Sequence, residues 1–130
     1  LSFKLKSYET VINRRREVAG IYQERLSNLD ELQLPAGPVI NEDNFDTYQN
    51  YELQGDNRNQ LQSFLKENGV GTLVQWGGTA IHQFTNLGFN QICPNTEKFF
   101  ERCIMLPMNV FVSDDDVHYV CDKVTEFYRR

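Results

Sequence analysis

Cysteine is too scarce in this sequence to support a zinc site. There are three cysteines, Cys93, Cys103 and Cys121, and no two of them have the CxxC spacing. A structural zinc site usually takes four ligands that come in close pairs. We therefore expect no bound metal, and three reduced, partly buried thiols of the kind found in cytoplasmic proteins.

Excess positive charge and long apolar runs are also missing. The formal net charge is -5, whereas a nucleic-acid-binding surface is normally basic. No apolar run approaches the roughly 20 residues that a membrane-spanning helix needs. The start of the chain is not a methionine and shows no secretory signal pattern. We expect part of a longer cytoplasmic chain, without nucleic-acid or membrane partners.

The remaining composition is that of one globular domain. Its 130 residues are 40% hydrophobic and 24% charged, which is enough apolar content for a core. Hydrophobic periodicity and turn residues predict helices over residues 7–28, 56–69 and 94–102 and from Ser113 onward, a helical turn over 80–86, and strands over 44–54, 73–74 and 104–108. This order predicts a small sheet of about three strands with helices packed against it.

Two charged clusters have competing interpretations. Arg15 interrupts the apolar stripe of the first long helix and forms a short basic cluster with Arg14 and Arg16. For this cluster we favour a solvated helix face over a phosphate site. Asp114, Asp115 and Asp116 follow Ser113, and we favour the start of a helix over a cation site, because acids there complement the helix dipole. Ser113 and Asp116 have the spacing of a capping box.

The stretch from Gly69 to Phe84 is the best candidate for a functional site. Asn68-Gly69 predicts the end of a helix, and Leu73-Val74 a short buried strand. A glycine pair then allows a sharp turn or a close backbone approach. The candidate site residues of this loop are Gln75, Trp76, Gly77, Gly78 and His82.

Structural roles remain open for three of the side chains that could form a site. Trp76 could instead fill the core beside Phe84, and His82 could be a surface or structurally bonded residue. His118 follows the acidic cluster and is better explained as structural or solvated.

Five segments, in order, resemble the C-terminal part of the DegT/DnrJ/EryC1/StrS family of pyridoxal-phosphate-dependent sugar aminotransferases. The similarity covers essentially the whole chain. The five segments are Ile12–Tyr22, which is similar to the family's RRxxAxxY helix, then Tyr48–Tyr51, Leu61–Gly71, Leu106–Met108, and Ser113–Val117 with Tyr119–Val120.

The resemblance implies a fold and a place in a longer protein. Residues 1–130 would be the C-terminal small domain of a fold-type I transferase, which is α+β with a small, mostly antiparallel sheet of about three strands and helices packed on it. Residues 1–30 would form a long helix leading from a large cofactor domain that this chain lacks. We therefore expect apolar side chains to be exposed at Leu1, Phe3, Leu5 and Tyr8.

The resemblance also implies a reaction, in which a keto group of a nucleotide-linked sugar becomes an amine, usually with glutamate as donor. The full-length protein would be a homodimer with pyridoxal phosphate (PLP), bound mainly by the missing domain. None of the lysines has the sequence context of the family's cofactor lysine, so we expect this chain alone to be inactive; they are Lys4, Lys6, Lys66, Lys98 and Lys123.

The chain departs from the family pattern in the candidate loop. Many members have His-Tyr and then prolines where this chain has Gln75-Trp76 and Gly77-Gly78, whereas His82 takes roughly the place of a second histidine. The resemblance implies contact of this loop with the substrate. A PLP-dependent nucleotide-sugar dehydratase of the same family, and a non-catalytic sugar-binding or interaction module, remain as alternatives.

Overall fold

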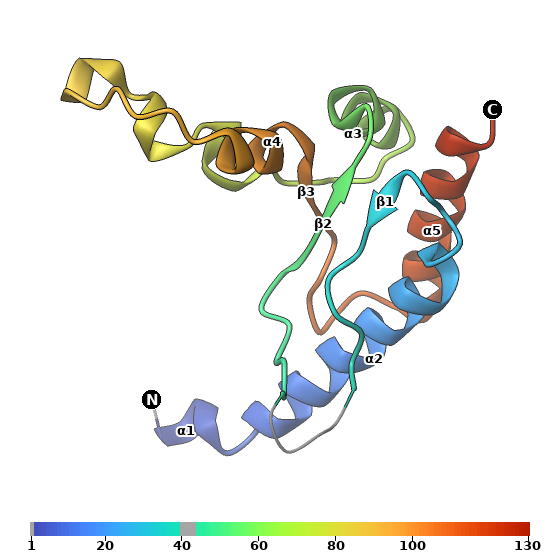
Figure 1. Cartoon of the computed structure of the whole chain (residues 1–130). Helices are drawn as coiled ribbons and strands as arrows, with labels where there is room; N and C mark the ends of the chain where they lie inside the picture. Colours follow the sequence, from blue (N-terminus) through green and yellow to red (C-terminus); the bar gives the residue numbers. More distant parts are fainter. Residues whose placement is uncertain (1, 40–43) are drawn as a thin grey trace.

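A three-stranded antiparallel sheet lies at the centre of the computed structural model, which describes residues 2–39 and 44–130. The strands are β1 (Leu32–Gln33), β2 (Tyr51–Gly55) and β3 (Cys103–Leu106), in the order β1-β2-β3. Leu32 pairs with Gly55, and Tyr51 with Leu106. The predicted α+β fold with about three strands is confirmed (Figure 1).

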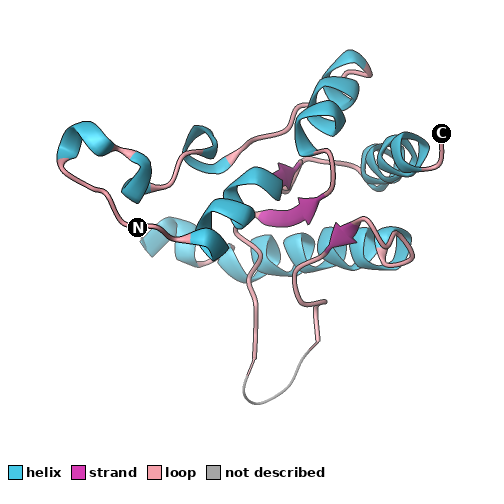
Figure 2. Ribbon diagram, turned by 45° about the horizontal axis from the view of Figure 1, so that its top comes forward, coloured by secondary structure: helices cyan, strands magenta, loops and turns pink. Residues whose placement is uncertain are grey.

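Five α-helices and three short 3₁₀ turns are described around this sheet. The helices are α1 (Ser2–Leu5), α2 (Tyr8–Leu26), α3 (Arg58–Glu67), α4 (Pro94–Arg102) and α5 (Asp114–Tyr128). The 3₁₀ turns are η1 (Gln75–Gly78), η2 (Ile81–Gln83) and η3 (Thr85–Leu87). Helices α2 and α5 pack side by side, whereas the segment from η1 to α4 extends away from them (Figures 1 and 2). None of the described helices is long and apolar enough to cross a membrane.

The core joins α2, α5 and the central strand β2. Tyr22 of α2 and Tyr51 of β2 are both buried, and their ring centroids are 4.7 Å apart. The hydroxyl of Tyr22 donates to the carbonyl of Pro107 at 2.8 Å, which satisfies a polar group that would be costly to bury alone. Helix α5 contributes the predicted apolar stripe, whose buried members are Val117, Val120, Cys121 and Val124.

The predicted strand over residues 44–54 is wrong in its first half. Strand β2 begins only at Tyr51, and Tyr48 has a left-handed φ of 47°. The backbone N–H of Tyr48 donates to the carboxylate of Asp46 at 2.7 Å. An aspartate that bonds the backbone two residues later stabilises a turn, and this turn replaces the first part of the expected strand.

The predicted buried strand at Leu73-Val74 is also wrong. Leu73 forms only an isolated bridge with Met105, and 69% of its surface is exposed. The chain turns into η1 directly afterwards, at Gln75. The third strand is instead β1, a two-residue segment that has too few residues to show an alternating pattern.

Helix α3 begins at Arg58, and its N-cap is one residue after the predicted cap, Asp56. Its N-cap is Asn57, which has a left-handed φ of 54°. The carboxylate of Asp56 pairs instead with the guanidinium of Arg102, at 2.5 Å. Asp56 therefore joins the start of α3 to the end of α4 rather than capping the helix.

The interpretation of the arginine cluster as a solvated face is wrong. Arg16 is buried, and its guanidinium donates to the carbonyls of Asp46 at 2.6 Å and Pro38 at 2.9 Å. Arg14 donates to the carbonyl of Val112 at 2.6 Å and pairs with Asp114 at 2.8 Å. The guanidinium groups of Arg14 and Arg16 hold distant segments of the chain against α2. These contacts explain both side chains without a phosphate ligand.

The interpretation of the acidic cluster as a helix start is confirmed. Asp114, Asp115 and Asp116 form the first turn of α5. The N–H of Asp116 donates to Ser113 Oγ at 3.1 Å, and the N–H of Ser113 donates to the carboxylate of Asp116 at 3.1 Å. The Ser113 hydroxyl also donates to this carboxylate, at 2.6 Å, and the hydrogen bonds from the hydroxyl and the N–H of Ser113 lower the pKa of Asp116.

The start of the chain exposes the apolar residues that the sequence predicted there. Phe3 is 86% exposed, and Leu5 and Tyr8 are exposed as well, while Leu1 lies outside the described residues. Residues 1–30 are not one unbroken helix, because α1 ends at Leu5 and α2 begins at Tyr8.

Replacing Gly69 by alanine is expected to lower the free energy of unfolding by about 1 kcal/mol. Gly69 follows α3 with a φ of +76°, where a side chain is strained although nothing lies within 4 Å of the added carbon. A urea titration followed by circular dichroism measures the loss. Gly71→Ala is the matched control, because Gly71 has equal space without the positive φ. An equal loss in both variants would contradict the conformational explanation.

Candidate functional site

An apolar cavity of about 820 Å³ lies between the η1–η2 segment and helix α4. The residues that line it come from the predicted loop and from the start and middle of α4. Its apolar walls are Trp76, Ile81, Phe84 and Phe100, and its polar groups include Thr79, His82, Cys93 and Thr96. A concave surface that is mostly apolar and carries a small number of polar groups is typical of a small-molecule site.

Trp76 is held in the open by the backbone of η1. Its φ is 51°, and those of Gly77 and Gly78 are 65° and 77°, so three successive residues are left-handed. A left-handed backbone is strained for tryptophan but not for glycine. Strain of this kind is concentrated at functional sites. The side chain of Trp76 is 78% exposed, which contradicts the alternative that it fills the core.

His82 lines the same cavity and is fixed by a carboxylate from α4. Its Nε2 lies 3.2 Å from Glu97 Oε1, and 10% of the histidine side chain is exposed. The backbone N–H of Cys93 donates to the same oxygen at 3.4 Å. Glu97 thereby connects η2 to the first turn of α4, so His82 is both structurally bonded and part of the cavity wall.

The predicted site residues divide between two depressions. Trp76 and His82 line the apolar cavity, whereas Gly77 and Gly78 line a second depression of about 530 Å³ against Arg58 of α3. Gln75 lines neither of the two. The five candidates therefore share one loop but not one cavity.

The contribution of α4 to the cavity was not predicted from the sequence. Cys93, Thr96 and Phe100 line it, and Glu97 anchors His82. The sequence signal for the helix was clear, since Pro94 fits its first turn and Phe99-Phe100 gives it an apolar side. Nothing in the sequence showed that this helix packs beside the η1–η2 loop.

The remaining histidine has the structural role that the sequence favoured. His118 Nδ1 lies 3.0 Å from the guanidinium of Arg25, which also pairs with Asp122 at 2.5 Å. These contacts join α2 to α5. His118 is not among the residues that line the apolar cavity.

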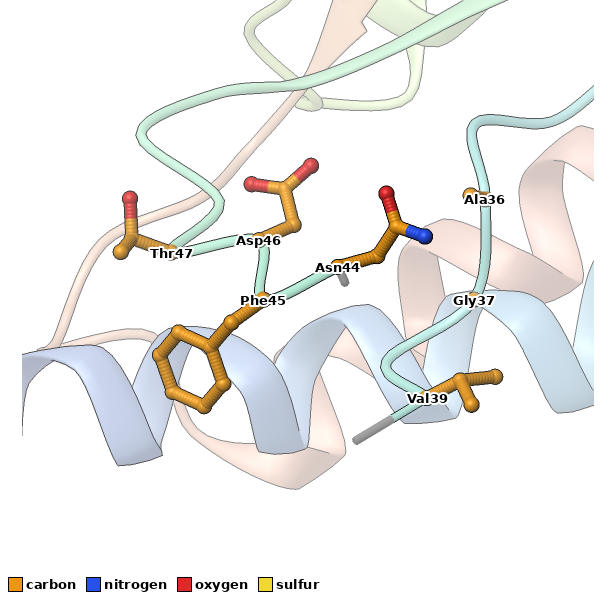
Figure 3. A pocket seen from close by; sticks show the side chains of 7 residues that line it. All are labelled: Ala36, Gly37, Val39, Asn44, Phe45, Asp46 and Thr47. Atoms are coloured by element: carbon orange, nitrogen blue, oxygen red, sulfur yellow. The ribbon is translucent and has the colours of Figure 1, made fainter. Parts of the chain in front are cut away.

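A separate depression of about 610 Å³ is lined by residues within 36–39 and 44–47 (Figure 3). Its lining includes Phe45, whose ring lies 4.3 Å from the guanidinium carbon of the buried Arg16. The one carboxylate in the lining, Asp46, already accepts the N–H of Tyr48. The polar groups here hold the loop, so we do not regard it as the functional site.

The lining of the apolar cavity offers no attachment point for PLP, and the described residues offer no metal centre. PLP forms a Schiff base with a lysine, and no lysine lines the apolar cavity. No group of three or more histidine, cysteine, aspartate or glutamate residues could hold a metal ion within the described parts of the chain. The arrangement can instead bind the apolar part of a ligand.

Comparison with known proteins gives a match over nearly the whole chain. The model of the DegT/DnrJ/EryC1/StrS aminotransferase family matches residues 1–125. The crystal structure of the aminotransferase TlmJ from Streptoalloteichus hindustanus superimposes with a TM-score of 0.86 at 28% identity, covering 96% of this chain and 34% of TlmJ.

Two curated relatives are aminotransferases of different nucleotide-linked sugars. The dTDP-4-dehydro-2,3,6-trideoxy-D-glucose 4-aminotransferase of Saccharopolyspora spinosa is 26% identical over 94% of this chain and 31% of its own length. The UDP-2-acetamido-2-deoxy-3-oxo-D-glucuronate aminotransferase of Pseudomonas aeruginosa is 28% identical over 94% of this chain and 33% of its own. The chain thus spans about a third of the length of these relatives.

Proposed function

This chain belongs to the DegT/DnrJ/EryC1/StrS aminotransferase family, and on that premise we propose that it is the C-terminal small domain of a nucleotide-sugar aminotransferase. The full-length protein converts a keto group of the sugar to an amine, with PLP as cofactor and glutamate as amino donor. The observation that carries this proposal is the family match over residues 1–125. Residues 1–30 then lead from the cofactor domain into this one.

The cofactor belongs to the rest of the protein in this proposal. PLP supplies an electron sink for the transfer of the amino group. The cavity of this chain has no lysine to bind it, and the chain spans about a third of the relatives' length. We therefore expect the 130-residue chain to be inactive alone, and its residues to act on the sugar.

Trp76 and His82 are the residues proposed to contact the substrate. The exposed indole of Trp76 offers a flat apolar face to a sugar ring. His82 uses Nε2 in its contact with Glu97, so its Nδ1 is the ring atom proposed to bond a sugar hydroxyl. Gln75, Gly77 and Gly78 shape the turn that carries Trp76. The side chains of Trp76 and His82 would bind and orient the sugar and exclude water from it.

A homodimer in the cytoplasm is the proposed setting of the enzyme. The segment between η2 and α4 exposes two large apolar side chains that do not line the cavity, Leu87 and Ile92, and a second subunit would cover them. All three cysteines are free, as a reducing compartment permits.

An absorption spectrum of the full-length protein with PLP, before and after L-glutamate, tests the proposed function. We expect the Schiff-base band to disappear and the pyridoxamine band to appear, because the amino group moves from glutamate to the cofactor. D-glutamate is the matched control and should leave the spectrum unchanged. A Schiff-base band that persists with L-glutamate would contradict glutamate as donor, and absence of any such band would favour the dehydratase or the non-catalytic module.

A further inference from the structure

We propose that Arg58 is a positioning residue, whose guanidinium holds the left-handed η1 turn from the start of α3 and thereby sets the orientation of Trp76. Arg58 is not among the residues that line the apolar cavity, so it acts through Trp76 and not on a ligand. The contacts that carry this proposal lie inside this chain. Only the consequence for the substrate rests on the proposed function, in which Trp76 contacts the sugar.

The η1 turn is strained, and its own hydrogen bonds are weak. Trp76, Gly77 and Gly78 have φ values of 51°, 65° and 77°, a region that residues other than glycine rarely occupy. The N–H of Gly77 donates to the carbonyl of Val74 at 3.2 Å. The N–H of Thr79 donates to the carbonyl of Trp76 at 3.4 Å, which is longer than an ordinary N–H···O bond. A strained backbone persists only where the surrounding structure holds it.

Arg58 lies against one side of this turn. A side-chain carbon added at Gly78 would lie 3.4 Å from Nη2 and 3.7 Å from Nη1 of Arg58. The guanidinium is therefore next to the space that a side chain at this position would fill. Gly77 differs from Gly78 in this respect, since nothing lies within 4 Å of a carbon added there. The contact is thus specific to the last residue of the turn.

The same guanidinium is anchored to α4, which carries another wall of the cavity. Nη2 of Arg58 donates to the carbonyl of Phe100 at 3.0 Å. This carbonyl belongs to the last turn of α4, where carbonyls lack partners within the helix and a cation is favourable. Phe100 and Trp76 both line the cavity. One side chain therefore connects the two elements that present these rings.

Arg58 is itself fixed at the junction of α3 and α4. The nearby Asp56 pairs with Arg102 at the end of α4, and Arg58 is the first residue of α3. The Nε of Arg58 is buried without a hydrogen-bond partner among the described residues. Burying this group costs free energy that an arginine on an exposed helix face would not lose. The guanidinium thus lies beneath η1 despite that cost, which supports a role in holding the turn.

Trp76 is the only tryptophan of this chain, so a label on its indole reports the turn directly. In the full-length protein, we expect 5-fluorotryptophan at this position to give one sharp ¹⁹F resonance, assigned by its loss in Trp76→Phe. In Arg58→Met, which keeps a long side chain but not its donors, we expect this resonance to shift and to become at least about twice as wide, because the turn then exchanges between conformations.

Arg102→Met is the matched control for this measurement. It removes a guanidinium from the same junction, but Arg102 is not among the residues that border the depression beside η1. We expect the Trp76 resonance to stay unchanged in this variant, and far-UV circular dichroism verifies that both variants are folded. An unchanged resonance in folded Arg58→Met, or an equal change in both variants, would overturn the inference.

Arg58→Lys distinguishes the planar guanidinium from a positive charge alone, and it carries the test if Arg58→Met does not fold. One ammonium group can donate to the carbonyl of Phe100, but it lacks the planar fork that reaches α4 and Gly78 together. We expect a resonance with a width between those of the wild type and Arg58→Met. A resonance identical to that of the wild type would show that one donor to α4 is sufficient, which would also overturn the inference.

The ¹⁹F measurement and the cofactor spectrum fail independently of each other. If L-glutamate converts the cofactor and the Trp76 resonance is unchanged in Arg58→Met, the proposed reaction stands and Arg58 does not position Trp76. If Arg58→Met broadens the resonance and L-glutamate leaves the cofactor unchanged, the positioning role stands and the proposed reaction is wrong.

Discussion

Replacing Arg16 by alanine is expected to lower the free energy of unfolding of the chain by about 3 kcal/mol. The buried guanidinium donates to the carbonyls of Asp46 at 2.6 Å and Pro38 at 2.9 Å. Both carbonyls lose a charged donor in the variant, and each such loss costs about 1–3 kcal/mol. A urea titration followed by far-UV circular dichroism measures the difference.

Arg15→Ala is the matched control for this prediction. Arg15 has the same charge and lies on the same helix, but it is only partly buried and its Nε has no hydrogen-bond partner, so we expect a smaller loss than at Arg16. Arg16→Lys should lose an intermediate amount, because one ammonium group cannot reproduce the planar fork of donors. Equal losses in the alanine variants would show that Arg16 does not hold the loop.

The arginine cluster illustrates what the sequence could not show. Helical spacing placed Arg15 on the apolar stripe of the first helix, whereas the structure buries Arg16. The partners of Arg16 are carbonyls at Pro38 and Asp46, more than twenty residues away in the sequence. Every residue has a backbone carbonyl. The sequence therefore carries no signal of which carbonyls accept hydrogen bonds from a given side chain.

Elements with strong local signals were predicted well. Helix α4 has the predicted bounds, and α5 begins after Ser113 as its capping box indicated. These signals act within one or two turns of a helix. Strand β1 was missed because two residues cannot alternate, and β2 was predicted too long because the Asp46 turn resembles a polar strand edge.

Two of the nine residues that line the candidate site could be predicted from the sequence. Trp76 and His82 attracted attention because they flank a glycine pair, and both line the cavity. Thr96 and Cys93 were missed because they reach it only through the packing of α4 beside η1. A site assembled from one loop and one later helix requires the tertiary structure, and periodicity within either segment does not reveal it.

Raising the pH from 9 to 12 is expected to unfold the chain. Burial raises the pKa of Tyr22, Tyr51 and Tyr128, and it raises the pKa of the Cys121 thiol to about 12. In the unfolded chain, tyrosines ionise near pH 10 and cysteines near 8.5. The folded state therefore keeps protons that the unfolded state has released, so stability is complete below about pH 8 and falls as the pH rises.

The size of this effect follows from the number of buried groups. Each group contributes about 1.4 kcal/mol per pH unit between its unfolded and folded pKa values. The three tyrosines together lower the stability by about 4 kcal/mol per pH unit above about pH 10, and a domain of this size has about 5–15 kcal/mol to lose. Absorbance at 295 nm, which reports phenolate, and far-UV circular dichroism should change together in one transition.

Tyr128→Phe and Tyr8→Phe distinguish burial from a general effect of alkali. Tyr128 donates its hydroxyl to the carbonyl of Asp56 at 2.7 Å, whereas Tyr8 is exposed at the start of α2. Removing the Tyr128 hydroxyl should reduce the contribution of these tyrosines to the pH dependence of stability by about a third, since one of three phenols with a raised pKa no longer titrates. The exposed position should have no such effect. Full phenolate absorbance near pH 10 in a chain that keeps its circular dichroism would refute the linkage.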